Sequence, residues 1–201
     1  MFTKAHAHDD DKKVWLGIDE VQTLLDAPDD ENKRLAYALG VRCGLRSEEV
    51  TEVRPDDIVE TDAGTFLLVR EGKGDTYRET PIPNSLANTI RAAARFRSEP
   101  ATDPVVTSES STPGVSTRTL RRWIETTRDH LAIDSGEDRW HHLSFHDLRR
   151  TWATQLKSAD VDALLVCDWG GWDDLDTFLD HYRGTYAPDV QARERKKVSW
   201  L

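Results

Sequence analysis

Apolar residues recur every three or four positions along most of the chain, which is the spacing of amphipathic helices. This pattern predicts a helix at about 16–25, a second that Gly44 ends, a third capped by Ser47, and further helices at about 85–97, 116–131, 146–157, 161–168, 174–182 and from 188 onward. A strand pattern occurs at 65–69 and 77–82, on either side of the turn sequence EGKGD. The predicted fold is therefore mainly α, with a small antiparallel β-hairpin or sheet that carries Lys73 at its tip.

The length of 201 residues and the apolar content of 37% fit one compact domain. We place this domain at 15–201, because residues 1–14 are polar and lack periodicity, as in a disordered leader. No apolar run is long enough for a membrane span or a signal peptide, so a cytoplasmic protein is expected. Cys43 and Cys167 lie far apart in apolar stretches and are interpreted as core residues rather than a disulfide.

The net charge of −10 argues at first against a nucleic-acid partner, because phosphate binding normally depends on Lys and Arg. The charged residues are unevenly chosen, however: 24 Asp against 13 Glu, and 19 Arg against 8 Lys. This bias is typical of halophilic proteins. In molar salt the Debye length falls to about 3 Å, so a diffuse acidic surface repels DNA only weakly while close arginine contacts persist.

The segment HDLRRTWATQL places His146 and Arg149 three residues apart, on one face of a predicted helix. A guanidinium is matched to phosphate oxygens, and imidazole exchanges its proton near neutral pH. This pair could therefore serve phosphate chemistry. Taken alone, it is better explained by a buried histidine beside a surface arginine.

Further polar motifs follow a fixed order along the chain: GLRSEEV with Arg46, EGKGD with Lys73, HDLRR, GGW with Trp172, and DHY with Tyr182. In this order the chain resembles the tyrosine recombinases, also called phage integrases, from about Trp15 to the C-terminus. The resemblance implies the catalytic-domain fold of that family. It also implies site-specific DNA recombination, by strand cleavage and rejoining through a 3′-phosphotyrosyl intermediate.

The resemblance assigns Arg46 and Arg149 to the scissile phosphate, where preorganised donors each contribute about 2.7 to 4 kcal/mol of transition-state stabilisation. Trp172 would add its indole N–H, since the family uses His or Trp at this place.

Tyr182 would be the nucleophile. A phenol with a pKa near 10 needs a base, for which His146 is the candidate, and Lys73 resembles the general acid that protonates the leaving 5′ oxygen. Because a phosphotyrosyl bond conserves the energy of the broken linkage, no metal or other cofactor is expected.

Two departures from the family pattern concern the nucleophile and the N-terminus. The interval from Trp172 to Tyr182 is ten residues where nine is usual, and His181 occupies the usual place. Trp169 is the alternative to Trp172 as the indole donor, and Tyr186 is the alternative to Tyr182 as the nucleophile. Family members also carry an N-terminal core-binding domain, and only about fifteen residues precede the catalytic segment here.

Double-stranded DNA is the expected partner, bound by a homo-tetramer on paired sites. The candidate DNA-contacting residues are Arg118, Arg121 and Arg122, on the basic helix at 116–131, together with Arg150, although a solvated basic face explains that helix equally well. Two other functions stay open. One is a DNA-binding regulator that keeps the fold without catalysis, and the other is DNA relaxation by a type IB topoisomerase.

Overall fold

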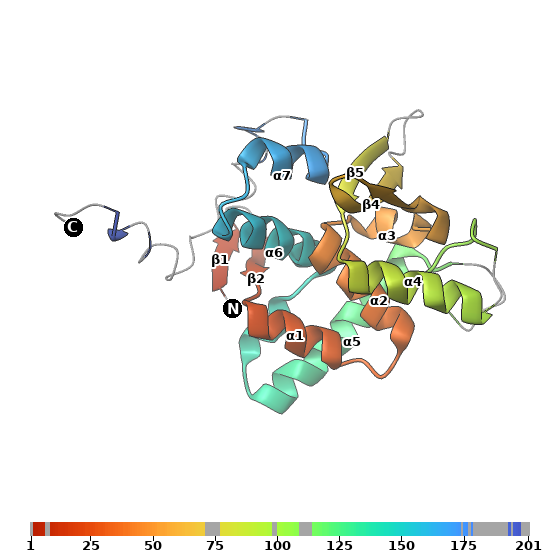
Figure 1. The fold of residues 1–201 in the computed structure, drawn as a ribbon. Coiled ribbons are helices and arrows are strands. Elements are labelled where there is room, and N and C mark those ends of the chain that lie inside the picture. The colour runs from red at the N-terminus through yellow and green to blue at the C-terminus, as the bar shows by residue number, and fades with distance from the viewer. Residues whose placement is uncertain are drawn as a thin grey trace.

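Helices α2 (Glu31–Cys43) and α6 (Phe145–Ser158) pack against each other at the centre of the molecule, and the other elements surround them (Figure 1). The structure is a computed structural model that describes residues 2–6, 9–70, 77–97, 100–108 and 114–173, with residues 175, 176, 178, 193 and 195–197. The surrounding helices are α1 (Ile18–Asp26), α3 (Ser47–Glu52), α4 (Asn84–Arg97), α5 (Thr117–Ser135), α7 (Ala163–Gly170) and the 3-10 helices η1 (Pro55–Asp57) and η2 (Asp138–His142). Within these described residues, no helix is both long and apolar enough to cross a bilayer.

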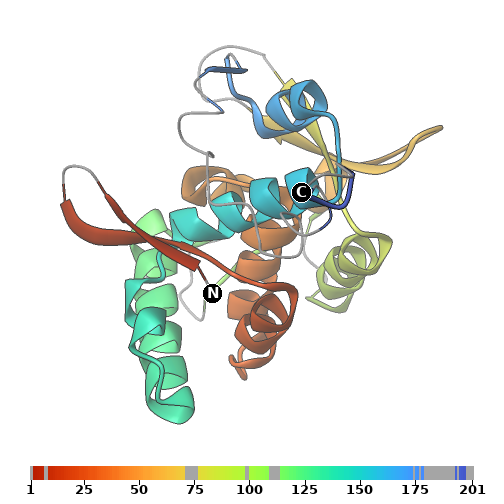
Figure 2. The ribbon, with the colours of Figure 1, turned by 90° about the vertical axis from the view of Figure 1, so that its left-hand side faces the viewer.

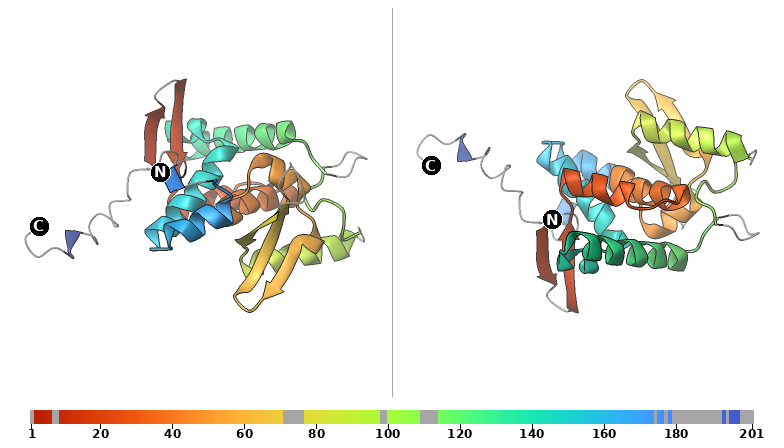
Figure 3. Two further views of the ribbon diagram at one scale, coloured as in Figure 1. Left: turned by 90° about the horizontal axis from the view of Figure 1, so that it is seen from above. Right: turned by 90° about the horizontal axis from the view of Figure 1, so that it is seen from below.

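Three antiparallel strands form a small sheet in the order β3 (Ile58–Thr61), β4 (Gly64–Arg70) and β5 (Tyr77–Pro81). Strands β4 and β5 are the arms of the predicted hairpin and pair from Phe66–Pro81 to Arg70–Tyr77. Strand β3 extends this hairpin by one strand that the sequence pattern does not predict, and the sheet lies beside α4 (Figure 3). The prediction of a mainly helical fold with a small antiparallel sheet is confirmed.

The N-terminal segment differs from the disordered leader that we expected. Strands β1 (Phe2–His6) and β2 (Asp9–Trp15) pair antiparallel and project from the helical body (Figure 2). At the end of β2 the chain is held against α6: the backbone N–H of Val14 donates to Asp147 Oδ1 at 3.2 Å, and that of Leu16 donates to Thr151 Oγ1 at 3.1 Å. Buried hydrogen bonds and the buried side chains of residues 14–16 therefore make the start of the domain part of its core.

Two apolar clusters form the core and meet on α6. The larger cluster includes Leu39 of α2 and Leu148 of α6, both fully buried. The smaller cluster joins α6 to α7 and consists of Trp152, Ala153, Val166, Cys167 and Phe178. Cys43 and Cys167 are both buried and are not joined to each other by a disulfide, which confirms that they are core residues.

The joint between α2 and α3 is shaped by a glycine and a glutamate. Gly44 ends α2 in the left-handed conformation, with φ of 70°, and a Cβ placed there would lie 2.3 Å from the ring of Trp152. Helix α3 begins one residue earlier than predicted: Arg46, not Ser47, is its N-cap, because Glu49 Oε2 accepts the backbone N–H of Arg46 at 2.7 Å. With Arg46 as the N-cap, this residue still lies on the joint between α2 and α3, as the sequence predicts.

Candidate active site

Two arginines converge on the turn that follows helix α7. Arg46 Nη2 donates to the carbonyl oxygen of Gly171 at 2.9 Å, and Arg149 Nη2 donates to that of Gly170 at 2.5 Å. Arg149 Nη1 also donates to the carbonyl oxygen of Gly44 at 2.6 Å, in the joint that carries Arg46. Segments that are distant in sequence therefore bring two guanidiniums to one place. Such a pair of planar, permanently charged donors is suited to the oxygens of a phosphate.

Trp172 lies against the buried arginine of this pair. The Arg149 side chain is 1% exposed, and its Cζ lies 4.0 Å from the centroid of the Trp172 ring. The same ring stacks on Trp152 and is tilted against Phe178, with centroids 6.2 and 5.0 Å apart respectively. Trp172 thus presents a ring face to Arg149, a cation–π arrangement. The predicted donation of its indole N–H to a phosphate stays a prediction.

The carboxylate of Glu49 bridges Arg46 to a third arginine, Arg78 of β5. Arg46 Nη1 donates to Glu49 Oε1 at 2.8 Å, while Arg78 donates to both Glu49 oxygens, at 2.7 and 2.8 Å. Burial by itself raises the pKa of Glu49. The hydrogen bonds and charges of Arg78, and then those of Arg46, outweigh burial and lower this pKa to about 2. Glu49 is therefore a carboxylate at all ordinary pH values and holds Arg46 in place.

Helix α6 supplies both members of the predicted His-x-x-Arg pair. His146 lies in its first turn and is exposed, whereas Arg149 is buried one turn later. Between them, the buried Asp147 accepts hydrogen bonds from the backbone N–H and the hydroxyl of Ser144, at 2.9 and 2.6 Å. These bonds cap the helix N-terminus and fix the turn that carries His146.

Comparison with known proteins shows the family to which the chain belongs. The sequence profile of the phage integrase family matches residues 15–187. The chain belongs to this family. It is 31% identical over 187 residues to the tyrosine recombinase XerA of Thermococcus kodakarensis, a match that covers 91% of this chain and 62% of that protein. It is 28% identical over 173 residues to the tyrosine recombinase XerC of Alcanivorax borkumensis, with 81% and 53% covered.

Solved structures of phage integrase relatives share the fold. A crystal structure of XerA recombinase superposes with a TM-score of 0.72 at 18% identity, over 92% of this chain and 64% of that one. The XerH recombinase bound to its difH substrate gives 0.67 at 20% identity, over 92% and 54%. The predicted tyrosine recombinase catalytic-domain fold is thereby confirmed. The chain spans about three fifths of the length of the XerA proteins that it matches.

Of the six catalytic residues that the phage integrase resemblance assigns, Arg46, Arg149 and Trp172 come together in the structure, and His146 lies on the same helix as Arg149. Lys73 and Tyr182 lie outside the described residues, as do His181 and Tyr186. Their roles stay predictions.

Helix α5 carries the predicted DNA-contacting arginines. Arg118, Arg121 and Arg122 are exposed, whereas Arg128 of the same helix donates to the carbonyl oxygen of Leu143 at 2.9 Å. Arg150, the fourth candidate, forms an ion pair with Asp147 and is mostly buried. The three exposed arginines therefore offer charge to a ligand, while Arg128 has a structural contact.

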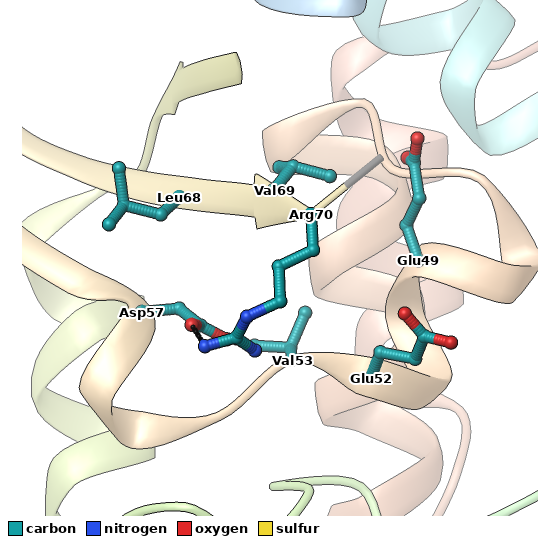
Figure 4. A pocket seen from close by; sticks show the side chains of 7 residues that line it. All are labelled: Glu49, Glu52, Val53, Asp57, Leu68, Val69 and Arg70. Carbon is teal, nitrogen blue, oxygen red and sulfur yellow. Dashed lines mark hydrogen bonds and ion pairs between the residues drawn. The ribbon is translucent and has the colours of Figure 1, made fainter. Parts of the chain in front are cut away.

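A pocket that Glu49 helps to line has a different character (Figure 4). It lies between α3, η1 and β4 and is lined by Glu49, Glu52, Val53, Asp57, Leu68, Val69 and Arg70. Arg70 extends across it to Asp57 and forms two contacts with that carboxylate, at 2.5 and 3.1 Å. With three carboxylates and one paired arginine in its walls, this pocket is unsuited to a phosphate.

Proposed function

We propose that this protein carries out site-specific DNA recombination, in which Tyr182 attacks a backbone phosphate held by Arg46 and Arg149. The observation that carries the proposal is the convergence of these two guanidiniums on the carbonyls of Gly170 and Gly171. Membership of the phage integrase family, whose tyrosine recombinases break and rejoin DNA, supports it.

In the proposed reaction, the Tyr182 oxygen forms a bond to phosphorus as His146 takes the phenolic proton. The bond from phosphorus to the 5′ oxygen breaks, and Lys73 donates the proton that makes a free 5′ hydroxyl. Negative charge grows on the non-bridging oxygens, where the two guanidiniums stabilise it and Trp172 adds an N–H donor. Attack by a 5′ hydroxyl of a partner strand then reverses these steps, releases Tyr182 and completes the exchange.

The proposed partner is double-stranded DNA, bound by four protomers on two paired sites. The relatives support this class of partner: XerH is bound to its difH substrate, and lambda integrase is a dimer bound to a core site. Arg118, Arg121 and Arg122 provide an exposed basic surface on α5 for backbone contacts.

A covalent-adduct assay tests the proposal. The protein is incubated in molar salt with a nicked suicide duplex, whose sequence is selected for binding from a random pool, and the products are separated in denaturant. We expect a protein–DNA adduct from the wild type and from Tyr186→Phe, and none from Tyr182→Phe. An adduct with Tyr182→Phe refutes the choice of nucleophile.

Three further measurements, of DNA binding, plasmid relaxation and strand exchange, separate the two rival functions. DNA binding without any adduct from the wild type defeats the proposal in favour of a regulator that keeps the fold. Relaxation of a supercoiled plasmid that has no paired sites favours a topoisomerase. Strand exchange that requires two sites is the result expected of a recombinase.

A further inference from the structure

Arg78 is a buried arginine of strand β5 for which the proposed mechanism has no use. Its side chain is 7% exposed, and three of its nitrogen atoms donate to protein acceptors. Two of these bonds form a fork onto the Glu49 carboxylate, and the third joins Nε to the carbonyl oxygen of Trp169 at 3.0 Å. A charge buried to this extent is costly unless its partners are well placed, so its geometry is tightly determined.

Arg78 and Arg46 share an acceptor atom on Glu49. Glu49 Oε1 accepts from Arg78 Nη1 at 2.7 Å and from Arg46 Nη1 at 2.8 Å, so one oxygen atom joins the two guanidiniums. The Arg46 side chain is 40% exposed and long, and without a fixed anion beside it many rotamers are accessible. Because Arg78 holds the carboxylate from its buried side, Glu49 presents a rigid acceptor to Arg46.

Arg78 also links two other parts of the proposed site. It lies five residues after Lys73, on the arm by which the β4–β5 hairpin returns to the domain. Its bond to Trp169 reaches the last turn of α7, directly before the Gly170 and Gly171 carbonyls that accept Arg149 and Arg46. One side chain therefore joins strand β5, the Arg46 joint and the last turn of α7.

We propose that Arg78 is a positioning residue for DNA cleavage, which acts through Glu49 to hold Arg46 in the geometry of attack. This inference rests on the proposed function. It predicts an effect on the chemical step rather than on DNA binding. A misplacement of about 1 Å at a reacting centre can cost about 10²-fold in rate, so the expected effect is measurable.

The hairpin offers a matched control in Arg70 of β4. Arg70 also forms two bonds with a buried carboxylate, that of Asp57. This ion pair lies in the pocket between α3, η1 and β4. Arg70 is more exposed than Arg78, 34% against 7%, and its substitution removes an ion pair of the same sheet while the bonds of Glu49 to Arg78 and Arg46 remain. If Arg78 only stabilises the fold, both substitutions lower stability and both leave the rate of adduct formation at the wild-type value.

The experiment measures the single-turnover rate of adduct formation at saturating suicide duplex, together with the dissociation constant for that duplex. The variants are Arg78→Gln, Arg78→Lys, Glu49→Gln, Arg70→Gln, and Arg78→Gln combined with Glu49→Gln. We expect Arg78→Gln to lower the rate roughly 10- to 100-fold with unchanged affinity, and Arg78→Lys to lower it less. Arg70→Gln leaves the rate at the wild-type value. Once Glu49 is Gln, loss of Arg78 adds little, because both act on Arg46 along one path.

Equal rates for Arg78→Gln and Arg70→Gln overturn the proposal, as do fully additive effects of the Arg78 and Glu49 substitutions. If Arg78→Gln does not fold, Arg78→Lys carries the same comparison, and a wild-type rate in that variant overturns the proposal. Absence of an adduct from the wild type itself defeats the proposed function and this role with it. Failure of the proposed function is thus seen in the wild type, whereas failure of the Arg78 role alone is seen only when the variants are compared.

Discussion

The Arg149 guanidinium lies over the ring of Trp172, with its Cζ 4.0 Å from the ring centroid. Trp172 thus has two separable capacities, a ring face toward Arg149 and an N–H that we propose to bind phosphate. Trp172→Phe keeps a ring and loses the N–H, while Trp172→His restores a ring donor. We expect Trp172→Phe to slow adduct formation by up to about 10²-fold and Trp172→His to recover most of that loss. Equal rates for Phe and His assign the residue to packing against Arg149 alone.

The space around Gly44 makes a prediction about stability. Gly44 and Gly136 share the left-handed conformation, with φ of 70° and 69°, but an added Cβ meets the Trp152 ring at 2.3 Å in the first case and nothing within 4 Å in the second. Substitution by Ala costs about 1 kcal/mol at either site for the backbone alone. Gly44→Ala adds about 1 to 3 kcal/mol of overpacking. Urea denaturation of the two variants measures the difference, and equal losses contradict a close approach of Trp152.

The low pKa of Glu49 predicts how stability depends on pH. Its folded value of about 2 lies below the ordinary value of 4.5, so the stabilisation is fully present above pH 4.5 and is lost as the pH falls toward 2. We expect the wild type to exceed Glu49→Gln in free energy of unfolding by on the order of 3 kcal/mol at neutral pH. Denaturation of both proteins at several pH values tests this expectation. A gap that persists unchanged at pH 2 contradicts the assigned cause.

Salt dependence of DNA binding tests the α5 surface. Each lost phosphate contact reduces the magnitude of the slope of log K against log salt by about 0.9. We expect Arg121→Gln and Arg122→Gln to have this effect singly and to add when combined. Arg128→Gln is the control on the same helix, because Arg128 is bonded to the Leu143 carbonyl and its loss affects stability instead. Binding isotherms at several salt concentrations give the slopes, and unchanged slopes assign the two exposed arginines to solvent.

The elements that the sequence predicts best are those with strong local patterns. Gly44 after an apolar periodic run ends α2, and EGKGD separates the two hairpin strands, because both depend on a few adjacent residues. Strand β3 is four residues long, with its two apolar residues adjacent, so no alternating pattern reveals it. The strands of the leader likewise have mostly polar residues, and pairing between strands stabilises them in a way that periodicity does not report.

The candidate site shows the same division between local and distant contacts. The spacing of Arg46 and Glu49 within one helical turn indicates their pairing from the sequence alone. The contact of Arg78 with that same carboxylate joins a strand to a helix and has no local pattern, so it was missed. The position of Trp172 over Arg149 likewise depends on how α6 and α7 pack, which ordered motifs do not specify.

Asp147 joins the start of the domain to helix α6. The same carboxylate that caps α6 also receives the backbone of Val14, one residue from His146 and two from Arg149. Loss of this carboxylate therefore leaves the backbone N–H groups of Val14 and Ser144 without their acceptor. The N-terminal strand and the first turn of α6 are expected to loosen together.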